Sequence, residues 1–98
     1  MFIANLKYKK SIEEVNKVLE AHLEYLDKYF EKGKFICTGK KSFPELGGVI
    51  LFDSNNLEEA KKILHEDPFY IKEIADYEII EFQPVKFSQN LSIENLLY

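Results

Sequence analysis

Residues 11–33 read SIEEVNKVLEAHLEYLDKYFEKG and predict a long amphipathic helix around which the other elements can be placed. Ser11 and Glu14 have the spacing of a capping box, and Gly33 favours the left-handed conformation that ends many helices. At about 100° per residue, the charged side chains fall on one side of this helix. The opposite arc holds the apolar side chains and one histidine: Ile12, Val15, Val18, Leu19, His22, Leu23, Tyr25, Leu26, Tyr29 and Phe30. This pattern is typical of a surface helix that buries one face.

Four β-prone segments accompany this helix. Residues 2–8 alternate between two sets of side chains, which is the period of a strand. Further strands are predicted at residues 35–38, 49–52 and 77–82 from their β-prone and apolar composition. Residues 40–48 contain a proline and a glycine pair, so we expect them to form the main loop.

A second helix is predicted between the third and fourth strands. Asn55 or Asn56 can cap it, and Asp67 followed by Pro68 has the pattern of a new helix start. Its buried face would be formed by Leu57, Ala60, Ile63 and Leu64. The order β-α-β-β-α-β predicts an α+β fold of the ferredoxin-like type, a four-stranded antiparallel sheet with two helices on one face.

The second face of that sheet has no covering element within the predicted domain. Residues 49–52 are apolar on both faces, and Ile3 and Ile80 also point away from the helices in the expected register. Soluble monomers rarely expose an apolar patch of this size. We therefore predict a homodimer in which two sheets pack face to face.

The chain has 98 residues and a mass of 11.5 kDa, which is enough for one domain. We expect that domain to span residues 1–87. Residues 88–98 would form a C-terminal tail, in which Ser92 can cap a short helix; this tail either docks on the partner subunit, which we favour, or frays.

Charge and composition argue against several classes of function. Thirteen basic and seventeen acidic residues give a net charge of −4, so a nucleic-acid partner is not expected. No apolar run approaches the roughly 18 residues of a membrane span, and no membrane role is expected. A single cysteine, Cys37, and the absence of a signal-peptide pattern predict a reducing, cytoplasmic location.

Several short motifs occur together in a recognisable order. They are the opening strand and AHLEYL at residues 21–26, GKFICTG at 33–39, DPFY at 67–70 and DYEIIEFQP at 76–84. Each motif is weak alone, but the ordered set resembles the YciI-like (YCII-related) family over residues 1 to about 87. The resemblance implies a dimeric α+β barrel of ferredoxin-like subunits.

The same resemblance implies a cleft with a histidine from the first helix and an aspartate from the Asp-Pro turn. These would be His22 and Asp67 here. A few relatives of the family act on small aromatic or ring-derived substrates by proton transfer, including elimination of chloride from a chlorinated hydroxyquinone. Family members often have Gly-Pro after the second strand, whereas this sequence has Gly39-Lys40, so the rim of the pocket is expected to differ.

The residues themselves leave alternatives open for both predicted catalytic groups. His22 lies in the apolar arc and is either a general acid or base, or a core histidine bonded to a backbone carbonyl or a tyrosine. Asp67 starts a helix, partners His22, or does both, with one oxygen capping the helix and the other facing the imidazole.

Four more residues are candidate substrate contacts. Thr38 and Gly39 end the second predicted strand and either hold a substrate oxygen or simply form a turn. Phe69 and Tyr70 either line a pocket of aromatic size or anchor the Asp-Pro helix in the core. Cys37 is expected to be a small buried hydrophobe. His22, Cys37 and His65 have no metal-ligand spacing, so no metal and no cofactor are expected.

Three functions fit these features. The first is a cofactor-independent lyase, isomerase or dehydrohalogenase-type enzyme, acting on a small aromatic or carbonyl substrate in a cleft through His22 and Asp67. The second is a non-catalytic dimeric protein that binds a small molecule in the same cleft. The third is an assembly protein with an ordinary core histidine and no pocket.

Overall fold

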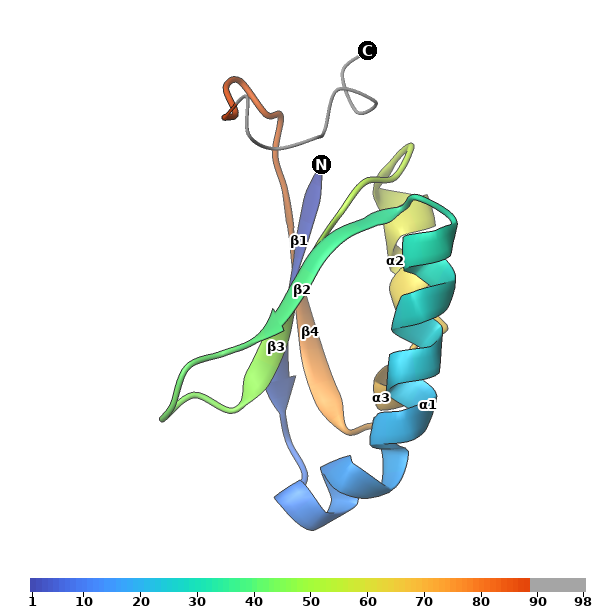
Figure 1. Cartoon of the computed structure of the whole chain (residues 1–98), viewed down its shortest axis with the longest axis vertical. Helices are drawn as coiled ribbons and strands as arrows, with labels where there is room; N and C mark the ends of the chain where they lie inside the picture. The colour runs from blue at the N-terminus through green and yellow to red at the C-terminus, as the bar shows by residue number, and fades with distance from the viewer. Residues whose placement is uncertain (89–98) are drawn as a thin grey trace.

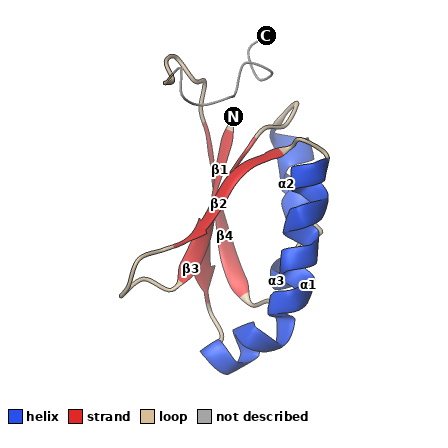
Figure 2. Cartoon of the chain, viewed as in Figure 1, coloured by secondary structure: helices blue, strands red, loops and turns tan. Residues whose placement is uncertain are grey.

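One face of a four-stranded antiparallel sheet carries all the helices in the computed structural model, which describes residues 1–88 (Figures 1 and 2). The strands lie in the order β2-β3-β1-β4. In chain order the elements are β1 (Phe2–Tyr8), α1 (Ile12–Glu31), β2 (Phe35–Lys40), β3 (Gly47–Phe52), α2 (Leu57–His65), α3 (Pro68–Ile71) and β4 (Ala75–Glu81). The predicted α+β, ferredoxin-like fold is confirmed.

The hairpin between β2 and β3 is longer than the sequence predicts. Lys40 pairs with Gly48, and Lys7 of β1 pairs with Gly47, so the loop shrinks to residues 41–46. Gly47 has φ +146 and approaches Leu6 so closely that any Cβ would overlap its carbonyl oxygen. Thr38 and Gly39 consequently lie inside β2, and the prediction that they end the strand was wrong.

Helix α1 begins at the predicted N-cap, Ser11, with one of the two hydrogen bonds of the predicted capping box. The Ser11 hydroxyl accepts the Glu14 amide at 3.3 Å, while the Glu14 carboxylate contacts Lys17. The helix buries Val15, His22, Tyr25, Leu26 and Tyr29 against the sheet. The outer part of the predicted apolar arc stays half-exposed, because the arc is wider than the surface that the sheet covers: Ile12, Leu19, Leu23 and Phe30.

The open face of the sheet is apolar at four strand positions. Ile3 of β1 pairs with Leu51 of β3 on one side and with Ile80 of β4 on the other. Asn5 of β1 pairs with Val49 of β3. Val49 and Ile80 remain 37% and 47% exposed. Cys37 lies beside Leu51 on this face and is exposed, so the expectation of a buried thiol was wrong.

Within residues 1–88, no helix is both long and apolar enough to cross a membrane. The same part of the chain contains no group of three or more histidine, cysteine, aspartate or glutamate side chains placed to hold a metal ion. The predicted tail helix from Ser92 lies outside the described residues. The domain boundary at residue 87 and the cytoplasmic location stay predictions.

Candidate functional site

A buried histidine and a buried aspartate meet beneath helix α1. His22 is 8% exposed and Asp67 is fully buried. Nδ1 of His22 lies 2.7 Å from Oδ1 of Asp67, although the two residues are 45 positions apart in the chain. The apolar periodicity of α1 directs His22 inward, and the helix start at Asp67-Pro68 directs the carboxylate toward it.

The two oxygens of Asp67 accept three hydrogen bonds. Oδ1 accepts the Phe69 amide at 2.9 Å as well as the His22 contact, and Oδ2 accepts the Tyr77 hydroxyl at 2.5 Å. One oxygen therefore both caps α3 and meets the imidazole, which differs from the predicted division between the two oxygens. Because a carboxylate can only accept, Nδ1 of His22 carries the proton in this arrangement.

The ring of Phe69 fixes the plane of the imidazole. The two rings are parallel within 3°, and their centroids are 3.9 Å apart. Tyr8 also packs edge-on against Phe69, with centroids 5.7 Å apart. Asp67 and Phe69 together hold His22 in one orientation, with one nitrogen committed to the carboxylate.

A cleft of about 180 Å³ lies between α1 and the strands β2 and β3, and His22 is part of its wall. Leucines of α1 and glycines of the two strands make the lining mostly apolar. Its polar side chains come from four residues: Tyr8, His22, Thr38 and Lys40. Nε2 of His22 has no hydrogen-bond partner among residues 1–88 and is not sealed from solvent. The imidazole therefore offers one unoccupied nitrogen at the cleft.

Three of the four predicted substrate contacts line the cleft, and the fourth does not. Thr38, Gly39 and Phe69 line the cleft, whereas Tyr70 lies outside it. The Thr38 hydroxyl already donates to the Val49 carbonyl at 3.0 Å. Phe69 is 1% exposed and meets the cleft mainly as the platform beneath His22.

Three site residues were missed by the sequence analysis. Tyr8 and Lys40 line the cleft, and Tyr77 binds Asp67. The strand period contained a signal for Tyr8, which lies on the same side of β1 as Phe2, Ala4 and Leu6. Lys40 carried no such signal, because β2 was predicted to end before it.

The negative charge of Asp67 acts on the tyrosines around it. Burial raises the pKa of the Tyr77 hydroxyl well above its usual value, and the Asp67 carboxylate raises it further. The same two causes, in the same order, raise the pKa of Tyr8. Both phenols therefore stay protonated at neutral pH and act as neutral groups around one buried carboxylate.

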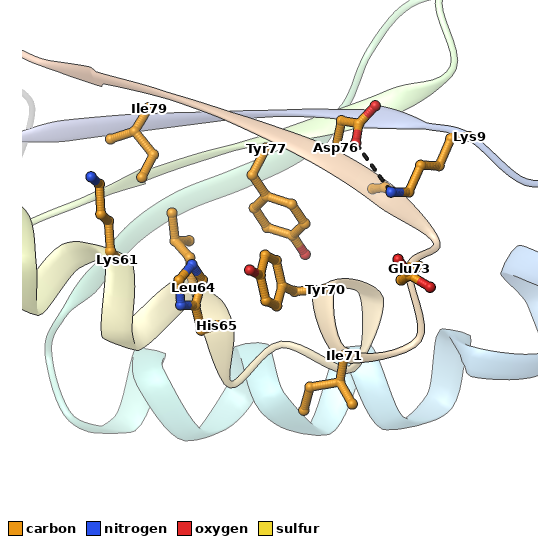
Figure 3. A pocket seen from close by; sticks show the side chains of 11 residues that line it. Lys9, Lys61, Leu64, His65, Tyr70, Ile71, Glu73, Asp76, Tyr77 and Ile79 are labelled. Atoms are coloured by element: carbon orange, nitrogen blue, oxygen red, sulfur yellow. Dashed lines mark ion pairs between the residues drawn. The ribbon is translucent and has the colours of Figure 1, made fainter.

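A second, larger cavity lies on the other side of α3, between α2 and the edge strand β4 (Figure 3). Its volume is about 800 Å³. Figure 3 shows Tyr70 and Tyr77 in its centre, with His65 beside Tyr70 and the Lys9–Asp76 ion pair at its rim. The rings of His65 and Tyr70 stack with centroids 4.2 Å apart. We call this the edge cavity. Its lining includes Tyr77, whose hydroxyl also donates to the Asp67 carboxylate of the buried pair.

Comparison with protein-family models gives one match, the YCII-related domain, over residues 1–83. This protein belongs to the YCII-related family. The match contains β1 through β4 and all the residues that form the cleft and the buried pair. Among curated proteins, no relative of this YCII-related chain is found by sequence.

Several solved structures have a similar fold. One of them is 5-chloro-2-hydroxyhydroquinone dehydrochlorinase from Burkholderia phenoliruptrix, in complex with 2,5-dihydroxybenzoquinone. The TM-score is 0.70, the sequence identity is 15%, and the match covers 85% of this chain and 94% of that one. At this identity, the likeness establishes the shared fold.

Proposed function

We propose that this protein is an enzyme that moves a proton on a small hydroxylated ring or carbonyl substrate, with His22 as the general base. Asp67 would orient the imidazole and stabilise the imidazolium that forms. Nε2 would take a proton from a substrate hydroxyl or carbon. In an isomerisation it would return that proton at another position, and in an elimination it would release it to water after the leaving group departs.

The observation that carries this proposal is the unoccupied Nε2 at the wall of a cleft. A core histidine with a purely structural role would have both nitrogens bonded or sealed among apolar groups. Here Nδ1 is bound to a fully buried carboxylate and Nε2 has no partner among the described residues. That arrangement is the one a general base needs, with its second nitrogen held by an orienting group.

The dimensions and lining of the cleft support a substrate of one ring. A cavity of about 150 Å³ holds a benzene molecule, and this cleft measures about 180 Å³. Lys40 forms no ion pair within residues 1–88 and places a cation at the lining, which favours a phenolate or carboxylate oxygen. The dehydrochlorinase of similar fold acts on a substrate of this size, a chlorinated hydroxyhydroquinone.

A non-catalytic ligand-binding protein is the second candidate. The mostly apolar lining favours it, because the Thr38 hydroxyl is occupied by Val49 and few polar groups remain to activate a substrate. In this case Nε2 of His22 would hold a ligand oxygen without transferring a proton.

A screen of hydroxylated and chlorinated single-ring compounds separates the two candidates. Each compound is tested for a rise in melting temperature and for consumption over several hours. The enzyme proposal expects at least one compound to be consumed by the wild type and not by His22→Ala. Compounds that stabilise the protein and are all recovered unchanged would support the binding protein instead.

We also propose that two copies pack through the open face of the sheet. Half-exposed Val49 and Ile80 and partly buried Leu51 support this arrangement, as does Asn5, whose amide oxygen is buried without a partner among residues 1–88. Sedimentation is expected to give a dimer for the wild type and a monomer for Leu51→Glu. Leu57→Glu, the same change at a half-exposed leucine of α2 on the helical side of the sheet, is the control. A wild-type monomer at micromolar concentration would contradict the dimer.

A further inference from the structure

Tyr77 connects the buried pair to the opposite side of α3. Its hydroxyl lies 2.5 Å from Oδ2 of Asp67, and its ring forms part of the wall of the edge cavity. Figure 3 shows this ring projecting from β4 toward Tyr70. The ring-to-ring contact between the two tyrosines is edge-on, with centroids 5.8 Å apart. Tyr77 is therefore held in place from one side by aromatic packing and from the other by the carboxylate.

The Tyr77 hydroxyl is the sole donor to Oδ2 among residues 1–88. The other two donors, His22 and the Phe69 amide, both meet Oδ1. Because Asp67 is fully buried, water cannot replace a lost donor without a rearrangement. Removal of this hydroxyl would leave a carboxylate oxygen unsatisfied, and the carboxylate could recover a donor only by turning about its Cβ–Cγ bond.

Such a turn would disturb the bond between Asp67 and His22. Oδ1 accepts the Phe69 amide of the helix cap, and Oδ2 accepts the Tyr77 hydroxyl. Because both oxygens are hydrogen-bonded, the plane of the carboxylate is fixed and Nδ1 of His22 meets Oδ1 in a single geometry. With Oδ2 released, the carboxylate can turn away from the short contact with Nδ1, and the hydrogen bond that favours the Nδ1-protonated tautomer becomes longer and weaker.

We propose that Tyr77 is a positioning residue for His22: through Asp67 it holds the imidazole in the tautomer that leaves Nε2 unprotonated at the cleft. This role rests on the proposed function for its consequence in catalysis, but its physical content is a property of the resting protein. Tyr77 touches no substrate in this scheme. Tyr77 lines the edge cavity, and it acts through Asp67 on Nε2 of His22 at the cleft.

Nitrogen-15 NMR of the His22 imidazole tests the proposal without any substrate. In the wild type, we expect Nδ1 to be protonated with a downfield proton resonance, and Nε2 to be unprotonated. In Tyr77→Phe, which keeps the ring and removes the hydroxyl, we expect the downfield resonance to broaden or vanish and the nitrogen shifts to move toward a mixture of tautomers. Tyr25→Phe is the matched control, because the buried Tyr25 hydroxyl donates to the Ile63 carbonyl and not to Asp67.

Unchanged His22 resonances in Tyr77→Phe would overturn the proposal, as would equal changes in Tyr25→Phe. The wild type gives a second reading, since the Tyr77 hydroxyl proton should be slow to exchange with solvent; a fast-exchanging hydroxyl would also contradict the role. If the screen finds a substrate, Tyr77→Phe should lower kcat about tenfold with little change in KM. If it finds none, the proposed function fails while the NMR result still decides the positioning role.

Discussion

The two cavities of this protein lie on opposite sides of α3 and differ in size, in exposure and in the surroundings of their histidines. Phe69 and Tyr70 are consecutive residues, yet Phe69 is 1% exposed beside the cleft and Tyr70 is 41% exposed in the edge cavity. The edge cavity is more than four times as large, about 800 Å³ against 180 Å³. Its histidine, His65, is exposed and stacks on Tyr70, while His22 is buried and bound to a carboxylate.

The comparison teaches that volume is a poor guide to the reactive part of this molecule. In the edge cavity, the Lys9–Asp76 pair has both side chains well exposed, so solvent screens its charges. Behind the wall of the cleft, the Asp67 carboxylate is sealed from water, is hydrogen-bonded to His22, and raises the pKa of Tyr77 and Tyr8. The buried charge of Asp67 therefore marks the smaller cleft, and not the edge cavity, as the candidate site.

The largest expected effect comes from replacing the histidine of each cavity with alanine in a separate variant. His22→Ala should lower turnover of a substrate found in the screen by about 100- to 10,000-fold, because a general base is lost. His65→Ala should leave turnover within about twofold of the wild type, measured by steady-state kinetics under the same conditions. Equal losses in the two variants would remove the distinction between the cavities.

The consecutive aromatic residues give the next largest effect, on stability. Phe69→Ala should lower the free energy of unfolding by about 3–5 kcal/mol, because it removes a buried ring stacked on His22. Tyr70→Ala should cost less than about 1 kcal/mol, since its side chain is already partly in water. Urea denaturation of both variants measures the difference, and similar costs would show that α3 does not separate a packed side from an open one.

Tyr77 lies between the two cavities and predicts a dependence of stability on alkaline pH. Its pKa is raised in the folded protein above the ordinary value of 10.0, first by burial and then by Asp67. The unfolded chain ionises first, so stability is complete below pH 10 and falls as the pH rises toward the folded pKa. Replacement by phenylalanine should reduce the slope above pH 10 by about 1.4 kcal/mol per pH unit.

Unfolding free energies between pH 9 and 11 provide the measurement. Tyr25 also has a raised pKa, chiefly through burial, so some alkaline slope should remain in Tyr77→Phe. An identical slope in wild type and variant would mean that the Tyr77 hydroxyl is not held by the buried carboxylate.

The smallest expected effect concerns the lysines of the two cavities. Lys40→Met should weaken binding of an anionic single-ring ligand by about tenfold, because it removes the cation from the cleft lining. Lys61→Met makes the same change in the edge cavity and should leave the affinity unchanged. Isothermal titration with 2,5-dihydroxybenzoquinone as the probe measures the affinity of both variants. A larger loss of affinity in Lys61→Met would place the ligand in the edge cavity and contradict the prediction.

Much of this arrangement could be predicted from the sequence, because the local signals agree with the global fold. The cap at Ser11, the apolar arc of α1 and the Asp67-Pro68 start each appear where the pattern indicates them. His22 was identifiable as a polar residue in an apolar arc. These features depend on neighbours three or four positions away, which a sequence displays directly.

The contacts across the fold could not be predicted in the same way. The meeting of His22 with Asp67 depends on how α3 packs against α1, and Tyr77 enters the site through a strand that starts two residues earlier than expected. The separation of Phe69 from Tyr70 depends on the turn of a four-residue helix, which is too short to show a periodicity. Tertiary packing decided all three.

The most direct test of the central claim maps where a single-ring probe binds. In a titration with 2,5-dihydroxybenzoquinone followed by NMR, we expect saturable shifts at Nε2 of His22 and at the amides of Lys40 and Gly48, with the Nδ1 proton of His22 retained. Saturable shifts confined to His65, Tyr70 and the rest of the edge cavity, with His22 unchanged, would contradict it.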